Sequence, residues 1–567
     1  MTEIKNNLSE KKCAYIRNTV FLILIFVLEI FFFRELLQSG AMLGDCGDGR
    51  LNNLIMEHWY HVFCGNESIN TLSQFYPVTN TLSYTDMLLG FSIPYSVLRF
   101  FGVSMFKANK LVLIGVHFLG SYCLYFLLHK IYKLKDYAAF AAVTAFSFAN
   151  GYAVRTCHTQ MMALSFLPLI LIFASMTVKC WNNNKARRIY AMLFVTTYGL
   201  LAYTGWYTFF FSAIFLLVIM ISCIIHIFTN NRLLFLEIWN SIKKRIVELC
   251  CYAVWMVALL LPFLYWYLPT SKMSGSRKWV EEVIFYLPNF TDIANVGGGN
   301  RLLGKFIDSL KFSQYRVKGE KELMQGFSIV LLILMAILIW KLIHEYKKKK
   351  ILQQKIETDE VLYVSYARAL MFSLILVVEC AGMSLWWFIW KFVPGAGALR
   401  AVSRWYYFLL LPISILFAVL IDRYSRGRKE INYFVIVMVA TFCLWCSNVY
   451  AGDISNWNYA DDLNLIESVQ PPEGATIIAM MDSSETPQDL ALTNLDAWLI
   501  ADHYGIQTIN GYSGTFPENY GGIWNVNVPQ EEYLSMVQEW RELHQITDTV
   551  YVYDRNTKKW LEVRAPL

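Results

Sequence analysis

The chain has 567 residues, of which 56% are hydrophobic and only 16% are charged. In soluble domains roughly a quarter of the residues are charged. The low charged fraction and the mean hydropathy of +0.39 therefore exclude an ordinary soluble protein and indicate an integral membrane protein. The net charge of +6 is what Lys and Arg in cytoplasmic loops would give, and it requires no nucleic-acid partner.

The first apolar run, Asn18–Leu37, continues into a long polar loop without a small-residue cleavage pattern, so we expect a signal anchor. About eleven such runs are long enough to span a bilayer as helices. A further stretch, Met87–Phe101, contains Pro94 and Arg99 and predicts an interfacial or re-entrant helix. After the first, the predicted spans are Ala108–Leu128, Tyr137–Tyr152, Gln160–Val178, Ile189–Tyr203, Tyr207–Phe228, Ile246–Leu268, Leu323–Ile343, Tyr363–Trp386, Trp405–Ile421 and Ile431–Tyr450.

Positive charges gather in alternate loops, from Arg17 before the first span to the run Lys347–Lys350. The positive-inside rule therefore places the N-terminus in the cytoplasm and, with an odd number of spans, the C-terminus outside. Lys107 and Lys110 go against this trend.

Three long segments then face outward, at residues 38–107, 269–322 and 451–567. Residues 1–450 are predicted to form the transmembrane domain. The tail from residue 451 has no cysteine, and its apolar runs at 475–480 and 549–553 alternate with helix-like stretches at 490–503 and 530–544. This pattern predicts a small extracytoplasmic α/β domain.

An acidic motif, Gly44–Arg50, follows the first span and holds Asp45, Asp48 and Arg50. Its glycines let the backbone turn sharply, so both acids could face one small volume. Such a pair can be a general base, a metal clamp or a solvated loop. Cys46 lies in the same motif and could pair with Cys64.

The next residues, 51–60, have apolar side chains at helical spacing and carry Glu57 and His58 about two turns from the acids. This pattern indicates either an amphipathic surface helix with ordinary polar residues, or a helix whose Glu57 and His58 form a carboxylate–histidine cluster at the mouth of a cavity. A carboxylate near apolar surface gains basicity, which suits a general base.

Other candidate residues lie at predicted outer helix ends. Asp86 begins the interfacial helix and could be its cap or a catalytic group. His158 and Gln160 stand where the fourth span leaves the outer surface, beside Arg155. Either His158 is a cap or hydrogen-bonded core residue, or it belongs to a site shared with Asp48.

Arg400 and Arg404 are four residues apart, a spacing that predicts two guanidinia on one helix face. They could bind a phosphate through bidentate hydrogen bonds or snorkel to lipid headgroups. Glu29 and Glu379 fall within predicted spans, where carboxylates are costly and point to function or to structural pairing. No phosphate-binding loop, dinucleotide fingerprint, Cys/His zinc pattern or nucleophile elbow is present in the sequence.

Together these features resemble the GT-C superfamily of membrane glycosyltransferases, and more closely its bacterial YfhO-like multispanning proteins. The resemblance rests on Gly44–Arg50, on Phe75–Asp86, on His158 to Gln160 with Pro168, on Leu399–Arg404 and on the turn Asn510–Gly514. It implies a GT-C-like bundle of about eleven helices in a bacterial cell membrane.

The resemblance also implies roles for the candidate residues. In the family, a carboxylate in the first outer loop serves as general base or binds a divalent metal such as Mg or Mn. Asp48 is the first candidate for this role and Asp45 the second. Arg404 and Arg400 would hold the phosphate of a polyprenyl-phosphate-linked sugar donor. His158 and Asp86 would line the pocket. The candidate substrate-binding residues are Arg50, Glu57, His58, Asp86, His158, Gln160, Arg400 and Arg404.

The implied function is transfer of a sugar to a cell-envelope glycan, teichoic acid or lipid acceptor on the outer face of the membrane. Two alternatives stay open from the sequence. A transporter or flippase for a lipid-linked glycan would need a polar path through the spans. A non-catalytic envelope assembly protein would keep the fold without the chemistry.

Overall fold

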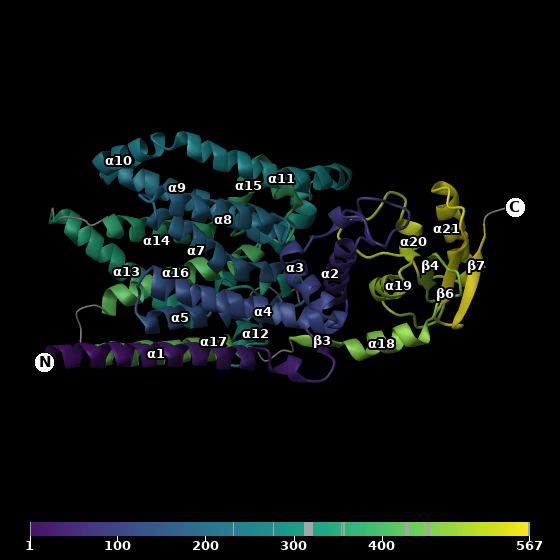
Figure 1. Cartoon of the computed structure of the whole chain (residues 1–567), viewed down its shortest axis with the longest axis horizontal. Helices are drawn as coiled ribbons and strands as arrows, with labels where there is room; N and C mark the ends of the chain where they lie inside the picture. The colour runs from purple at the N-terminus through teal and green to yellow at the C-terminus, as the bar shows by residue number, and fades with distance from the viewer. Residues whose placement is uncertain are drawn as a thin grey trace.

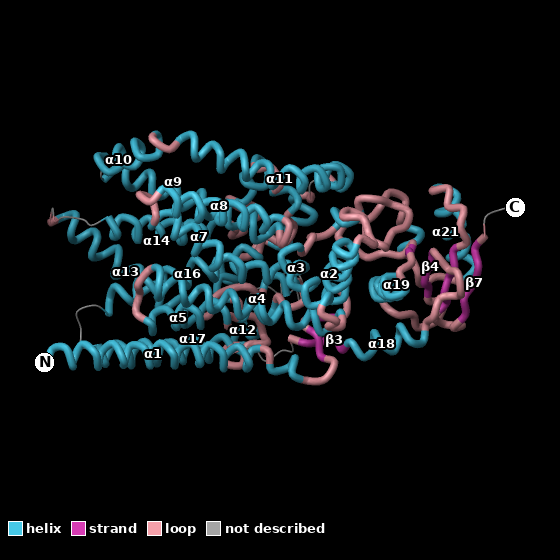
Figure 2. Tube along the Cα trace, in the orientation of Figure 1, coloured by secondary structure: helices cyan, strands magenta, loops and turns pink. Residues whose placement is uncertain are grey.

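The computed structural model describes residues 2–230, 232–275, 277–310, 321–352, 354, 358–425, 430–449 and 454–564. Most of the described chain is helical, and the helices form a long bundle with a small sheet-containing part at one end (Figures 1 and 2). By length and composition, eight described helices could cross a membrane. The predicted class, a polytopic helical membrane protein, is confirmed, whereas the count of eleven spans stays a prediction.

The eight candidate membrane helices alternate with shorter helices. They are α1 (Thr2–Phe32), α4 (Met105–Phe126) with the π-turn Leu127–Ile131, α7 (Leu167–Lys179) with the preceding 3-10 segment η4 (Thr159–Phe166), α9 (Trp206–Asn230), α11 (Ile246–Ser274), α13 (Ile329–Ile351), α16 (Arg404–Ser425) and α17 (Glu430–Asn448). The others before residue 430 are α2 (Asp48–Cys64), α3 (Leu89–Phe100), α5 (Asp136–Ser147), α6 (Asn150–Val154), α8 (Asn184–Ala202), α10 (Arg232–Lys243), α12 (Gly304–Leu310), α14 (Thr358–Leu376) and α15 (Trp386–Phe392).

Helix α16 is the core of the bundle, because nearly all of its side chains are buried. A helix that is apolar on every side needs partners all round, and α16 packs against α5, α9, α13 and α14. By contrast, α11 leaves most of its apolar side chains exposed on the bundle surface, as expected of a helix that faces lipid.

The loops predicted to be cytoplasmic meet at one end of the bundle, near the start of α1 (Figure 1). Arg17 forms an ion pair with Asp136 at 2.5 Å, and Arg423 and Lys349 both pair with Glu360. This grouping is what the positive-inside pattern requires. Which side of the membrane this end faces stays a prediction.

The sheet-containing part lies at the opposite end and agrees with the elements predicted for the tail (Figure 2). Its four-stranded sheet has the order β5-β4-β6-β7, with β4, β5 and β6 parallel and β7 antiparallel. Strand β4, which lies between β5 and β6, is wholly buried and apolar, as is usual for a parallel strand covered on both faces. The elements are α18 (Tyr459–Ser468), β4 (Ile477–Met481), α19 (Leu490–Tyr504), β5 (Gln507–Thr508), α20 (Gly521–Trp524), α21 (Gln530–Leu543), β6 (Val550–Asp554) and β7 (Lys559–Val563).

A second, three-stranded sheet ties this part to the first outward segment. Strand β3 (Ser455–Asn458) lies between β1 (Ala41–Met42) and β2 (Gly44–Asp45). Beside it, the buried guanidinium of Arg50 forms ion pairs with Asp462 of α18 and Asp496 of α19. The candidate Arg50 is therefore engaged in joining α2 to the C-terminal helices.

Four local features differ from what the sequence predicted or left open. The helix α14 ends at Leu376, so Glu379 lies outside a span and its backbone N–H donates to Pro288. Asp86 does not cap the interfacial helix, which begins at Leu89. Arg400 precedes α16, so it does not share a helix face with Arg404. Cys46 and Cys64 are both free thiols.

The second carboxylate predicted to lie within a span, Glu29, is fully buried and has polar partners. Its Oε2 lies 2.7 Å from Nδ1 of His117, and Ser121 donates to its Oε1. Because buried polar groups need such partners, this closed cluster on α1 and α4 has a structural explanation.

Arg50 provides a test of how the C-terminal part is held. Arg50→Met removes the guanidinium that pairs with the buried Asp462 carboxylate, while Asp496 keeps its ion pair with Arg555. Breaking a buried pair costs about 3–5 kcal/mol. We expect the opening free energy of α19 and β4 in the intact chain to fall by this amount, as measured by amide hydrogen exchange. The control is Arg564→Ala, whose pair with Glu562 is exposed and is worth about 0–1 kcal/mol. Equal protection in both variants would contradict the role of Arg50.

Candidate functional site

The acidic motif is held against residues 156–158 by a close backbone contact. Gly44 has φ +86°, and a Cβ on it would lie 2.7 Å from Cα of Cys157. Only glycine tolerates both conditions. Oδ1 of Asp45 accepts hydrogen bonds from the N–H groups of Gly47 (3.1 Å) and Asp48 (2.9 Å). Asp45 therefore stabilises the start of α2, where a negative charge is favourable.

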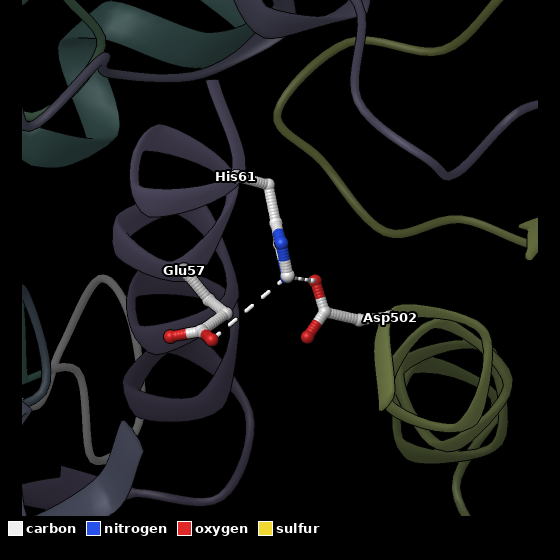
Figure 3. A group of neighbouring side chains, drawn as sticks. All are labelled: Glu57, His61 and Asp502. Carbon is white, nitrogen blue, oxygen red and sulfur yellow. Dashed lines mark ion pairs between the residues drawn. The ribbon is translucent and has the colours of Figure 1, made fainter. Parts of the chain in front are cut away.

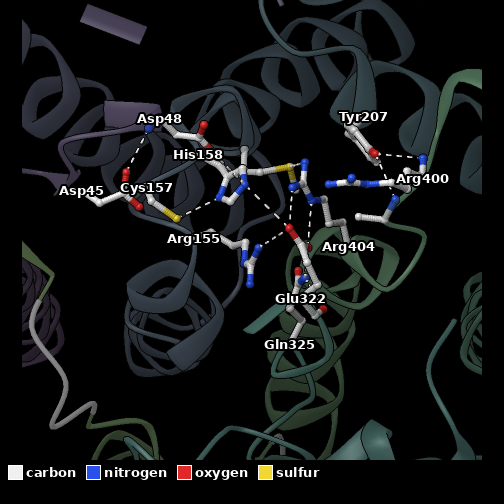
Figure 4. A network of polar contacts seen from close by, with 12 residues as sticks. Asp45, Asp48, Arg155, Cys157, His158, Tyr207, Glu322, Gln325, Arg400 and Arg404 are labelled. Carbon is white, nitrogen blue, oxygen red and sulfur yellow. Dashed lines mark hydrogen bonds and ion pairs between the residues drawn. The ribbon is translucent and has the colours of Figure 1, made fainter. Parts of the chain in front are cut away.

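Asp48 stands at the first turn of α2 and begins a polar network (Figure 4). Its Oδ2 lies 3.3 Å from Nε2 of His158, and that nitrogen lies 3.7 Å from Oε1 of Glu322. The Asp48 side chain is 31% exposed and the His158 side chain 18% exposed. Asp48 is thus the member of this chain of contacts with the most access to solvent.

Glu322 joins two buried arginines. Its carboxylate accepts two hydrogen bonds from Arg404, at 2.6 and 3.1 Å, and lies 2.9 Å from Nη1 of Arg155. Arg404 begins the core helix α16, and Arg155 follows α6. Two buried guanidinia thus meet at one carboxylate. Guanidinia bind anions through charge-assisted hydrogen bonds, so this part of the network suits an anion.

The electrostatics separate the three acid–base groups. Burial, with the Asp45 charge adding to it, raises the pKa of Asp48 above its ordinary range. Burial beside Arg404 lowers the pKa of His158 to about 3, so its imidazole is neutral at physiological pH. Burial alone would raise the pKa of Glu322, but Arg404 and Arg155 outweigh it and hold that pKa well below its usual range.

The turn Asn510–Gly514 reaches the network from the C-terminal part. The Tyr512 hydroxyl donates a 3.1 Å hydrogen bond to Oδ1 of Asp48. The turn itself is docked on the first outward segment, because the N–H of Tyr512 donates to Gln74 and the Ser513 hydroxyl donates to Tyr84. Folding of the tail thereby determines the environment of Asp48.

Arg400 and Asp86 lie at the edge of the network. The exposed guanidinium of Arg400 lies over the Tyr286 ring, 5.0 Å from its centroid. The backbone N–H of Arg400 donates a hydrogen bond to the Tyr207 hydroxyl (Figure 4). Asp86 is half-buried, its Oδ1 accepts a hydrogen bond from the N–H of Trp206 at 3.2 Å, and desolvation raises its pKa. Both are close enough to the network to act on its charges.

The structure pairs three candidate residues with other partners. Arg50 binds Asp462 and Asp496, Glu57 binds Arg99 and Tyr95, and His58 pairs with Glu67. Gln160 is half-buried in η4, and its Oε1 has no hydrogen-bond partner among the described residues. Sequence reasoning missed Glu322 and Tyr512 as neighbours of Asp48; neither has a spacing signal that points to the acidic motif.

Asp45 and Asp48 do not form a ready metal site with their neighbours. Among the described residues, the one group of three or more His, Cys, Asp or Glu side chains with ligand atoms within 4.8 Å of one another is Glu57, His61 and Asp502. Oδ1 of Asp45 is already committed to two backbone N–H groups. The described neighbours of Asp45 and Asp48 therefore do not fit the predicted Mg or Mn site.

No family model and no curated protein matches the chain. Among solved structures it is similar to the Archaeoglobus fulgidus oligosaccharyltransferase in complex with Zn and sulfate, with a TM-score of 0.45 and 12% identity over 96% of this chain and 73% of that one. It is also similar to the arabinofuranosyltransferase AftD from Mycobacteria, with a TM-score of 0.42 and 11% identity over 83% of this chain and 30% of that one. Because the TM-scores are below 0.5, the site residues carry the functional proposal.

Glu322 offers a direct test of the anion preference. Glu322→Gln removes the negative charge between Arg155 and Arg404, and one charge about 8 Å away is worth about 2 kcal/mol at an effective dielectric constant near 20. We expect inorganic phosphate to bind at least about tenfold tighter to this variant, measured by phosphate-dependent thermal stabilisation. The control is Glu281→Gln, whose ion pair with Lys278 is exposed. Unchanged phosphate affinity in Glu322→Gln would contradict an anion site at the two arginines.

Proposed function

We propose that the protein is a membrane glycosyltransferase that moves a sugar from a polyprenyl-phosphate-linked donor to a hydroxyl of a cell-envelope glycan, teichoic acid or lipid. The observation that carries the proposal is the joining of Asp48 to Arg404 through His158 and Glu322. A base that is partly exposed and a buried cation pair within one network are what a displacement with a phosphate leaving group requires.

In the proposed reaction, the acceptor hydroxyl gives its proton to the Asp48 carboxylate. The acceptor oxygen forms a bond to the anomeric carbon as the bond from that carbon to the donor phosphate oxygen breaks, which inverts the configuration. The phosphate keeps the electron pair and its developing charge faces Arg404 and Arg155. Preorganised cations in a buried place stabilise such charge more strongly than water does.

The position of Arg404 favours a lipid-borne donor over a free one. It is the first residue of α16, a helix long and apolar enough to cross a membrane. A phosphate bound by Arg404 would lie at the N-terminal end of this apolar helix, so the prenyl chain attached to the phosphate could remain in lipid. Glu322 aligns both guanidinia. Among the described residues, the one hydrogen-bond acceptor of Arg404 Nη1 is the Met161 sulfur, at 3.9 Å.

His158 is proposed as a positioning residue. Its neutral imidazole lies between Asp48 and Glu322 and keeps the two carboxylates apart. Asp86 and Arg400 are proposed to contact the sugar or acceptor at the edge of the network. We further propose that this site lies on the outer face of a bacterial membrane.

The first test is the base. Asp48→Asn cannot accept the proton, and losing a general base costs about 10²–10⁴-fold in rate. We expect this loss in a transfer assay with the purified chain and polyprenyl-phosphate sugars, and a smaller loss for Asp45→Asn, because Asp45 stabilises the helix start. Asp461→Asn, an exposed acid on α18, is the control. Undiminished transfer by both Asp48→Asn and Asp45→Asn would disprove the site.

The second test is pH dependence. Asp48 acts only when ionised, so transfer should fall as the pH drops through its raised pKa, which lies above the ordinary value of about 3.9. The Tyr512 hydroxyl stabilises the ionised form. We expect Tyr512→Phe to move the acid limb of the rate profile upward by about half to one pH unit, whereas Tyr504→Phe leaves it in place. An unmoved limb in Tyr512→Phe would argue against Asp48 as the titrating base.

A flippase is separated from this proposal by reconstituted vesicles. Translocation of the lipid-linked sugar without any acceptor, with no transfer when acceptor is added, would favour the flippase. Transfer that depends on Asp48 with acceptor present would exclude it.

A further inference from the structure

A second polar cluster lies between α2 and α19, apart from the network around Asp48 (Figure 3). Glu57 and His61 are one helical turn apart on α2, and Asp502 faces them from α19. Nε2 of His61 lies 3.8 Å from Oε1 of Glu57 and 3.7 Å from Oδ1 of Asp502. The cluster thus joins the bundle to the C-terminal part through one imidazole.

These separations are too long for hydrogen bonds but fit ligands around one ion. Zinc binds His nitrogen and carboxylate oxygen at about 2.0–2.2 Å, so two such ligands on a tetrahedral ion lie roughly 3.4 Å apart. All three ligand atoms of the cluster already lie within 4.8 Å of one another. Small side-chain rotations would bring them to the metal distance.

Asp502 is the independent sign that a ligand is missing. Its side chain is only 4% exposed and points at His61 (Figure 3). Among the described residues, no donor makes a hydrogen bond to its carboxylate, and His61 at 3.7 Å is its one ion-pair partner. A buried carboxylate without a partner is costly, and a cation would remove that cost.

The surroundings supply the charge and the supporting hydrogen bonds. The carboxylates of Glu57 and Glu67 both lie close enough to Asp502 to act on its charge, and each has a partner of its own, Arg99 for Glu57 and His58 for Glu67. Arg99 and Tyr95 donate to Glu57 and fix its orientation. Ligating carboxylates are usually held by such neighbours.

We propose that Glu57, His61 and Asp502 bind a divalent transition metal of the zinc class, which fastens α2 to α19. One imidazole and two carboxylates are a donor set that zinc accepts. Three protein ligands leave the fourth position to water. This site is separate from the proposed transfer site, because neither Asp48 nor His158 belongs to it.

The test is zinc binding by the intact chain in detergent, without a polyhistidine tag and after stripping with a chelator. Bound zinc is counted by mass spectrometry of the element, and its affinity is measured by competition with a zinc-binding dye. The variants are His61→Gln and Asp502→Asn. The controls are His503→Gln, an exposed histidine next to Asp502, and Asp48→Asn in the other network. Glu57→Gln is avoided because it would also unpair Arg99.

We expect one zinc ion per chain in the natural sequence and in both controls, with binding at least about tenfold weaker in His61→Gln and in Asp502→Asn. No stoichiometric zinc in the natural sequence, or unchanged affinity in both variants, would overturn the proposal. Loss of zinc in Asp48→Asn alone would also overturn it, since the ion would then belong to the other network. The result does not depend on sugar transfer, so it stands or fails separately from the proposed function.

His61→Cys keeps the proposal testable if the other variants fold poorly, because it replaces one zinc ligand with another. With cobalt as the probe, we expect this variant to bind one ion and to show a thiolate-to-metal absorption band that the natural sequence lacks. Cobalt binding without that band would place the ion elsewhere and reject the site.

Discussion

The bridge from Glu322 to two buried arginines is the interaction on which the polar network depends. Arg155 and Arg404 come from different parts of the bundle, and two buried guanidinia side by side would repel each other without a shared anion. Glu322 supplies that anion and also lies close to His158. A substrate phosphate would therefore enter a place whose cations are already aligned, which lowers the cost of organising them during reaction.

Helix α2 serves both polar clusters, which differ in the charge of the ligand they suit. At its first turn, Asp48 contacts a network that contains the buried guanidinia of Arg404 and Arg155. Near its other end, Glu57 and His61 meet Asp502. Between the two, Arg50 ties the helix to α18 and α19. One helix thus carries residues of the proposed anion site and of the proposed metal site, and it joins the bundle to the C-terminal part.

The C-terminal part acts on the network through backbone contacts as well as side chains. Gly511 packs directly on the ring of Phe75, where a Cβ would lie 2.4 Å from the ring edge. The N–H of Phe75 donates to the carbonyl of Asn510, and the indole of Trp540 donates to Tyr76. These contacts hold the turn that carries Tyr512, so the hydrogen bond to Asp48 follows from how the tail docks.

Local pattern was enough to predict the apolar helices, the strands and helices of the tail, and the placing of Asp48, His158 and Arg404 at one end of the membrane part. Periodicity and charge reflect the environment of a segment. They carry no information on which distant segments meet, so the partners of Glu322, Asp502 and Arg50 became known from the folded chain. Arg50 and Asp496 are 446 residues apart, and a pairing over that separation is fixed by packing of whole helices and strands.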